Sequence, residues 1–278
     1  MRKFKLINAI GQEYDLNDLD FFLYNPDQLG FRIGTKYETV GSQYHPYEES
    51  IEQPKPKGTI RFKQPGAYDK FNAFVVFCRK TPLRLEYTPA NTTFKLDCEV
   101  TELKKSEIST LGLTAPITLA GLGKWYKDVA EQTSDEDEGD GKTYDYTYPY
   151  VYSNSARGTV VIEDDASEKD SPAKITIFGP VINPVWNHYL NGEKIADGAV
   201  TANVPLGHKL VIDATSFPFR LTEQDMSGKV IYDRYEDSVW DTERFIHLHP
   251  GTNRITIGHS GANYPNLLVE VKLQYAAV

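Results

Sequence analysis

The chain has 278 residues, a formal net charge of −9 and a sequence pI near 5.2. Its length suits two ordinary domains or one large one, and a hydrophobic content of 40% is enough for packed cores. An acidic chain lacks the basic surface with which proteins bind DNA, so composition argues against a nucleic-acid partner. No stretch resembles a membrane span or a signal peptide, so we expect a soluble protein that is not exported by itself.

The first 41 residues predict short strands separated by turns. An opening strand carries Phe4 and Leu6, residues 19–24 are strongly apolar, and residues 30–41 alternate between apolar and polar side chains.

Residues 41–57 are polar and contain Pro46, Pro54 and Pro56. Because proline cannot donate a hydrogen bond to a sheet, this segment is not a central strand. From composition alone it is a surface loop.

The centre of the chain, residues 58–126, predicts strands around a single helix. Residues 59–62 alternate like a half-buried strand, and Pro65 stands where a helix can begin without losing a hydrogen bond. Residues three or four apart then define one apolar face of a helix at about 66–79: Tyr68, Phe71, Phe74, Val75 and Cys78. Residues 83–87 and 94–100 follow as a hairpin, and residues 115–119 as a further strand, which indicates a β-rich domain carrying one helix.

The two cysteines, Cys78 and Cys98, both lie in apolar runs. Buried free thiols are the interpretation that this setting favours, and a disulfide is the alternative. So few cysteines suit a protein made in a reducing cytoplasm.

An acidic run at residues 131–143 marks the clearest boundary. It has no apolar residue to anchor residues 134–141, so we expect a solvated linker or loop. A calcium loop is the alternative, but Gly139 and Tyr146 occupy positions of such a loop that should be ligands. The predicted division is residues 1–130, a linker at 131–143, and residues 144–278.

The second half predicts many strands and no helix. Alternating tyrosines at residues 144–152 open it, and turn signals such as Asn191-Gly192 and Pro250-Gly251 separate most of the later runs. The predicted strands are at residues 160–162, 173–178, 209–213, 230–232, 245–248, 253–257 and 267–275. Strands at this spacing without intervening helices indicate a β-sandwich.

Three motifs invite a catalytic or metal interpretation, and each is incomplete. Gly258-His259-Ser260-Gly261 lacks the second glycine and the following helix of a nucleophile elbow. His247 and His249 lie on one side of a strand without a recognisable third zinc ligand. Gly121-Leu122-Gly123 has neither dinucleotide-loop nor Walker spacing. We therefore predict no catalytic, cofactor or metal residues, and a protein that is not an enzyme.

Sugar binding is the rival function. An exposed ring could stack on a sugar, and the candidates are Trp186, Trp240, Tyr235 and Tyr264. The alternative is that these rings fill a core or an interface, where large aromatic side chains usually lie.

Motifs along the whole chain resemble the distal tail protein family of long-tailed phages that infect Gram-positive bacteria. In the first half these are Leu6-Ile7-Asn8-Ala9-Ile10-Gly11, the aromatic helix, the Leu83–Tyr87 strand, Lys105-Ser106-Glu107 and Trp125-Tyr126. In the second half they are Gly179-Pro180-Val181-Ile182-Asn183-Pro184, Asn191-Gly192, Leu210-Val211-Ile212-Asp213 and Gly251-Thr252-Asn253-Arg254-Ile255.

The resemblance implies a mainly β fold with two domains: an N-terminal sandwich or split barrel with one helix, and a C-terminal galectin-like sandwich. It also implies that residues 41–57 are an arm or hairpin reaching onto the next subunit of a ring. Tyr44, Tyr47 and Ile51 are the ring-interface residues that we predict in this arm.

The function implied is a structural one in the virion. Family members form a hexameric baseplate hub that joins the tail tube to the tail-tip protein and to receptor-binding proteins, with DNA only passing through the channel. We expect location at the tail tip, assembly in the host cytoplasm and no membrane contact; a prophage or tail-derived bacteriocin fits equally well. A carbohydrate-binding adhesin module is the alternative.

Overall fold

The computed structural model describes residues 2–110, 112–133, 158–165, 170–239, 245–261 and 265–278. These residues form a mainly β structure with one helix, and they divide into two compact units. Unit 1 comprises Met1–Lys127 and Tyr275–Val278, and unit 2 comprises Asp128–Gln274. The end of the chain therefore returns to the unit in which it begins, which the sequence did not predict.

Unit 1 is built on one antiparallel sheet whose strands run in the order β2-β1-β7-β8-β9-β6-β3. Its strands are β1 (Lys3–Ile7), β2 (Glu13–Asp15), β3 (Phe21–Asp27), β6 (Lys57–Phe62), β7 (Leu83–Thr88), β8 (Phe94–Leu103) and β9 (Leu113–Gly121). The turn after β1 is held by Asn8, whose Oδ1 accepts from the backbone N–H groups of Ile10 and Gln12. The Leu-Ile-Asn-Ala-Ile-Gly motif is thus a side-chain-capped turn.

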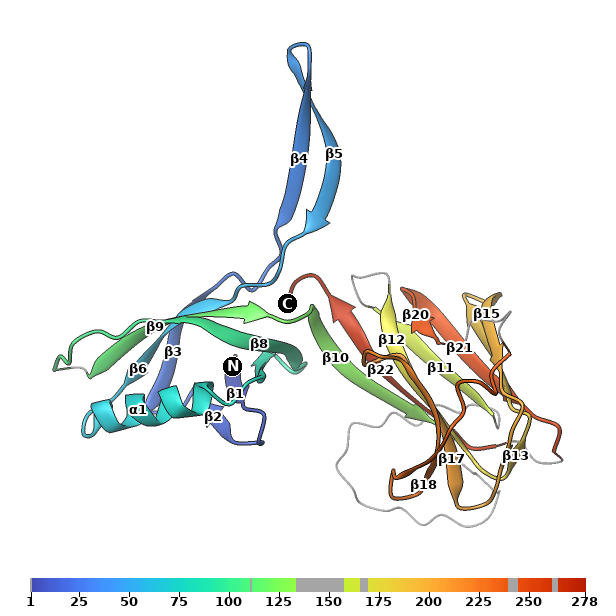
Figure 1. Cartoon of the computed structure of the whole chain (residues 1–278). Helices are drawn as coiled ribbons and strands as arrows, with labels where there is room; N and C mark the ends of the chain where they lie inside the picture. Colours follow the sequence, from blue (N-terminus) through green and yellow to red (C-terminus); the bar gives the residue numbers. More distant parts are fainter. Residues whose placement is uncertain (1, 111, 134–157, 166–169, 240–244, 262–264) are drawn as a thin grey trace. The chain divides into compact units, whose positions relative to one another are not determined.

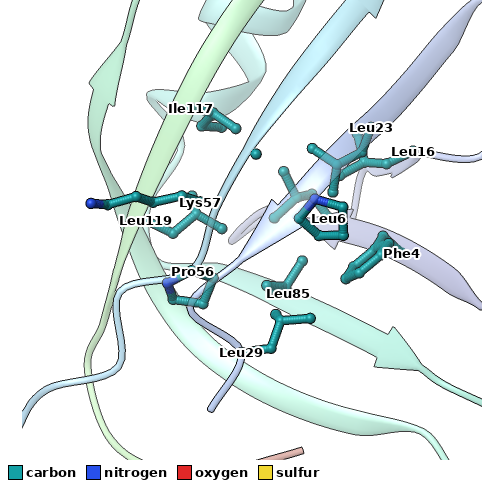
Figure 2. A pocket seen from close by; sticks show the side chains of 12 residues that line it. Phe4, Leu6, Leu16, Leu23, Leu29, Pro56, Lys57, Leu85, Ile117 and Leu119 are labelled. Carbon is teal, nitrogen blue, oxygen red and sulfur yellow. The ribbon is translucent and has the colours of Figure 1, made fainter. Parts of the chain in front are cut away.

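The core of unit 1 is apolar and closely filled. Alternate residues of β1, β6, β7 and β9 point into it, as the period of a strand requires. A cavity of about 20 Å³ lies in this core. Figure 2 shows Leu6, Leu23, Leu85 and Leu119 among the side chains that line it. That volume is about one water molecule, and the lining is almost wholly apolar, so the cavity is a packing defect and not a ligand site.

Helix α1 (Ala67–Cys78) packs against this core through Ala67, Phe71, Phe74, Phe77 and Cys78. The predicted buried face of the helix was wrong at two positions: it included Tyr68 and left out Phe77. Tyr68 is 38% exposed, and Phe77, which the sequence interpretation omitted, is buried. The cause is rotation of the face: positions 67, 71, 74 and 78 align along the helix and leave Tyr68 about 100° away. Val75 is half-buried at the edge of the core.

Both cysteines are free and buried, as predicted. Burial raises the pKa of each thiol to about 12, so both remain protonated at neutral pH.

Unit 2 consists mainly of two antiparallel sheets. One has the order β19-β18-β17-β12-β22-β10 and the other β11-β21-β14-β15. The strands of the first are β10 (Trp125–Gln132, which begins in unit 1), β12 (Ser171–Phe178), β17 (His208–Asp213), β18 (Arg220–Asp225), β19 (Val230–Asp233) and β22 (Leu267–Tyr275). Those of the second are β11 (Thr159–Asp164), β14 (Val185–Leu190), β15 (Glu193–Ala199) and β21 (Gly251–Gly258). Strands of both sheets bury alternate residues, the pattern of a sandwich.

Two short elements complete unit 2: the pair β13 (Val181–Ile182) and β16 (Asn203–Val204), and β20 (His247–Leu248), which pairs with β12. Asn191-Gly192 forms the predicted hairpin turn, with φ angles of +50° and +91°.

The acidic run begins later than predicted. Residues 131 and 132 continue β10, and Thr133 is buried, its backbone N–H donating to the carbonyl of Leu267 at 2.9 Å. Residues 134–157, which include most of the proposed linker and the alternating tyrosines, lie outside the described residues.

Candidate assembly interface

The candidate site is a long hairpin that projects from the rest of unit 1 (Figure 1). It consists of β4 (Ile33–Val40) and β5 (Gln43–Ile51), which pair only with each other. Gly41, with φ of +64°, and Ser42 make the two-residue turn that reverses the chain. We call residues 33–51 the arm.

All nine residues of β5 are exposed, although four of them, Tyr44, Pro46, Tyr47 and Ile51, are apolar or aromatic. Such a hairpin, with no further strand and no core, is marginally stable at best in water. The arm therefore exposes apolar side chains that no other strand covers in the described structure.

The pairing register divides the arm into two faces, because residues opposite each other in an antiparallel pair point to the same side. Ile33 lies opposite Ile51, Tyr37 opposite Pro46, and Thr39 opposite Tyr44. Together with Thr35 and Glu49, these residues form what we call the apolar face.

The other face is mostly charged or polar. Lys36 lies opposite Glu48, with an ion pair of 2.8 Å between Nζ and Oε2, and Glu38 lies opposite His45. Val40 at the tip is its one apolar member among the paired residues. The arm therefore presents two chemically different surfaces.

Of the three predicted interface residues, two lie on the apolar face and the third lies at a bulge. Tyr44 and Ile51 share the apolar face and are 75% and 43% exposed. Tyr47 is 61% exposed and is the extra residue of a β-bulge, since Tyr37 pairs with Pro46 and Lys36 with Glu48.

Sequence interpretation predicted the first strand, which carries Ile33 and Tyr37, but did not recognise that this strand belongs to the arm. It assigned residues 30–41 to a separate strand and began the arm at residue 41. The signal that could have joined them is Gly41-Ser42, a two-residue turn between two alternating runs.

The base of the arm is fixed to the body of unit 1. The backbone N–H of Glu52 donates to the carbonyl of Arg32 at 2.8 Å, and Gln53 Nε2 donates to the carbonyl of Gly121 at 2.8 Å. The carbonyls of Pro54 and Pro56 accept from the N–H groups of Gly121 and Leu119. The two prolines thus accept hydrogen bonds from β9 through their carbonyls, and their lack of an N–H group costs nothing at this edge.

The motifs considered for catalysis and metal binding are ordinary turns and packed side chains. After Gly258, Ser260 donates its N–H to the carbonyl of Ile182, and no helix begins in the described residues that follow. His249 forms an ion pair with Asp170 at 3.3 Å, and its ring stacks 6.3 Å from that of His188. Within the described ranges no three His, Cys, Asp or Glu side chains could hold a metal ion. No helix in that part of the chain is long and apolar enough to cross a membrane.

Of the four sugar-stacking candidates, Trp186 is fully buried, with Gly198 directly against its ring. Because the Trp186 ring lies in the core, a sugar cannot stack on it. Tyr235 is half-buried and its ring lies 6.4 Å from that of Phe245. Trp240 and Tyr264 lie outside the described residues.

Comparisons with known proteins give one family and several structures. A family model described as distal tail protein, N-terminal domain, matches residues 3–122. The structure is similar to a chain of the baseplate of phage P2 in its activated conformation with Ca, with a TM-score of 0.62 and 14% identity over 100% of both chains. It is also similar to the Dit protein of phage SPP1, described as a paradigm of the hub adsorption apparatus in phages infecting Gram-positive bacteria. Here the TM-score is 0.66 with 10% identity, over 96% of this chain and 98% of that one. At these identities the two structures establish the fold. No curated protein sequence matches the chain.

Proposed function

We propose that the protein is the hub of a phage baseplate, on the premise that residues 3–122 match the distal tail protein N-terminal domain. Six copies form a ring, and the arm of each subunit lies on the next one. The ring joins the tail tube to the tail-tip protein, and unit 2 serves as the docking platform for receptor-binding proteins. The protein is located at the tail tip after assembly in the host cytoplasm.

The observation that carries this proposal is the free-standing arm with its exposed apolar face. A closed ring uses head-to-tail contacts, so each subunit must offer two different, complementary surfaces. At about 3.4 Å per residue, the eight residues of β4 extend about 27 Å from the body, far enough to cross much of a neighbouring unit. An arm whose apolar face is not buried against the rest of unit 1 is suited to a second copy.

Rigid aromatic side chains are the usual anchors of protein interfaces because they bury large areas at low entropic cost. Tyr37 and Tyr44 lie on the apolar face and Tyr47 on the bulge beside it. We assign these three tyrosines, with Ile33 and Ile51, to the ring contact.

The decisive experiment shortens the arm without touching its base. Replacing residues 35–49 with a two-residue Asn-Gly turn leaves the Gly34–Ser50 pair and the hydrogen bonds of Gln53, Pro54 and Pro56 in place. We expect a folded monomer by light scattering, whereas the unaltered chain forms a hexamer visible as rings by negative-stain electron microscopy.

Two matched double variants separate the faces of the arm. Tyr37→Ser with Tyr44→Ser should abolish rings at micromolar concentration, because loss of two anchors costs each contact about 2 kcal/mol or more. Glu38→Ser with Gln43→Ser, on the other face, should leave them intact. Rings that survive shortening of the arm would place the subunit contact elsewhere.

A further inference from the structure

A large groove on unit 1 lies beside α1, and no residue of the arm lines it. It measures about 820 Å³, within the range of ligand-binding clefts, and runs between residues 12–15 and the outer side of the helix. Residues of β2, the start of β3 and α1 line it, elements that Figure 1 shows close together.

The floor of the groove is aromatic. The ring of Tyr14 makes edge contacts with Phe21 at 5.0 Å and Phe77 at 4.6 Å. The Tyr14 hydroxyl has no hydrogen-bond partner among the described residues, and burial raises the pKa of this hydroxyl, so it stays a donor at neutral pH. The floor offers apolar area and one unused polar group.

The rim adds exposed apolar side chains. Val76 lines the groove from α1 and is 59% exposed. Ile10 and Leu19, which are 64% and 80% exposed, flank the lining residues Gln12 and Asp18 in sequence. An exposed apolar side chain that lines a cleft, as Val76 does, adds apolar area that a partner can cover.

The charge of the groove is acidic. Glu13, Asp15 and Asp18 line it, and only Lys80 opposes them among its lining residues. Lys80 donates to Gln12 Oε1 at 3.0 Å, and Glu13 is paired with Lys5, so Asp15 and Asp18 are the carboxylates left without an ion pair in the described structure. A partner for this surface should carry positive charge beside its apolar side chains.

From this combination we infer that the groove binds a basic amphipathic segment of another tail protein, which inserts apolar side chains between Tyr14 and Val76 and sets Lys or Arg against Asp15 and Asp18. Binding of an amphipathic segment in an apolar groove is a common mode of recognition. A second copy suits the groove less, since the chain has a net charge of −9 and its arm carries three glutamates and one lysine.

The test uses the intact chain and a fluorescent 18-residue helical peptide made of leucine and lysine, with a leucine–glutamate peptide of the same pattern as control. Fluorescence anisotropy at about 0.15 M salt, where exposed charges more than about 8 Å apart are screened, should show binding of the lysine peptide alone. Asp15→Asn with Asp18→Asn should weaken it about tenfold, as loss of about 1.4 kcal/mol predicts. Val76→Ser should weaken it several-fold.

The matched control is Glu38→Gln with Glu48→Gln, which removes two exposed acids from the other face of the arm and should not change the affinity. If the control double variant weakened binding as much as the Asp15 and Asp18 double variant, the attraction would come from the net charge of the chain and not from the groove. That result, or no binding of the lysine peptide at all, would overturn the site. A change of the chain's mass in solution on altering Asp15, Asp18 or Val76 would mean that a second copy occupies the groove. If the wild-type chain stays monomeric, the proposed ring is wrong, but peptide binding to the groove can still be measured and judged separately.

Discussion

Among single residues, Glu223 on β18 is the most demanding to bury. It is 1% exposed, and its Oε2 accepts from Nε and Nη2 of Arg234 at 3.0 and 2.6 Å, while Oε1 lies 2.5 Å from Nδ1 of His208. Burial opposes the charged form, but the hydrogen bonds from His208 and Arg234 outweigh it, so the pKa of Glu223 falls below its ordinary value of 4.5.

Replacing Arg234 with methionine should destabilise unit 2 by about 3–5 kcal/mol, because a buried carboxylate loses its main partner. Equilibrium urea unfolding measures the change. Arg254→Met is the control: Arg254 lies exposed over the ring of Tyr189 at 4.3 Å, a contact whose loss costs about 1 kcal/mol or less. Equal losses in the two variants would contradict a special role for the buried pair.

The same carboxylate predicts a pH dependence. A pKa lowered by folding means that the stabilisation is fully present above pH 4.5 and is lost as the pH falls through the lowered pKa. The free energy of unfolding should therefore decrease on acidification, and this decrease should be smaller in Glu223→Gln, which has nothing to titrate. An identical pH profile in both proteins would show that other groups cause the loss.

Gly198 tests the packing of the buried tryptophan. A Cβ atom at this position would lie 2.3 Å from the ring of Trp186, too close for either to stay in place. Gly198→Ala should lower the stability by about 1–3 kcal/mol through overpacking. Gly258→Ala in the same unit meets no atom within 4 Å and should leave the thermal midpoint nearly unchanged.

At the scale of elements, α1 gives the clearest prediction. Phe74 is completely buried between Tyr14 and Phe62, so Phe74→Ala should cost about 3–5 kcal/mol, and Phe71→Ala somewhat less because Phe71 is 8% exposed. Tyr68→Ala should cost clearly less, since Tyr68 is 38% exposed and its hydroxyl and ring interact with Glu107 and Lys105 at the surface. Thermal unfolding that ranks Tyr68 with the two phenylalanines would refute the observed helix face.

Periodicity predicted most elements, and the failures have physical causes. Strands such as β12, β17 and β21 alternate clearly and were found, whereas β14 and β15 were missed. β14 buries the polar His188 where an apolar residue is expected, and β15 is bulged at Ile195. The arm was only half recognised: the alternation of residues 30–41 predicted β4, whereas β5 contains Pro46 and is exposed throughout, so composition alone predicted a loop there. Which face of the arm is apolar depends on the pairing register, and register is a property of two strands together.

At the scale of the whole molecule, the acidic run predicts a protease-sensitive site. Residues 135–141 contain no apolar side chain, so limited proteolysis should cut there first. The two pieces should nevertheless stay together in native gel filtration, because β10 precedes the cut and Thr133 is hydrogen-bonded to Leu267 after it. They should separate only in denaturant. Pieces that separate in native buffer would contradict the place of β10 in unit 2.

The return of residues 275–278 to unit 1 has a consequence for how such proteins can diversify. Tyr126 pairs with Lys95, and the ring of Tyr275 lies 5.1 Å from that of Phe94, so the chain leaves unit 1 and re-enters it at neighbouring points of β8. Unit 2 is in this sense an insertion whose two junctions are adjacent, the arrangement in which one domain can be exchanged for another without disturbing its host. A recombination event at residues 127 and 275 could graft a new module onto an unchanged base.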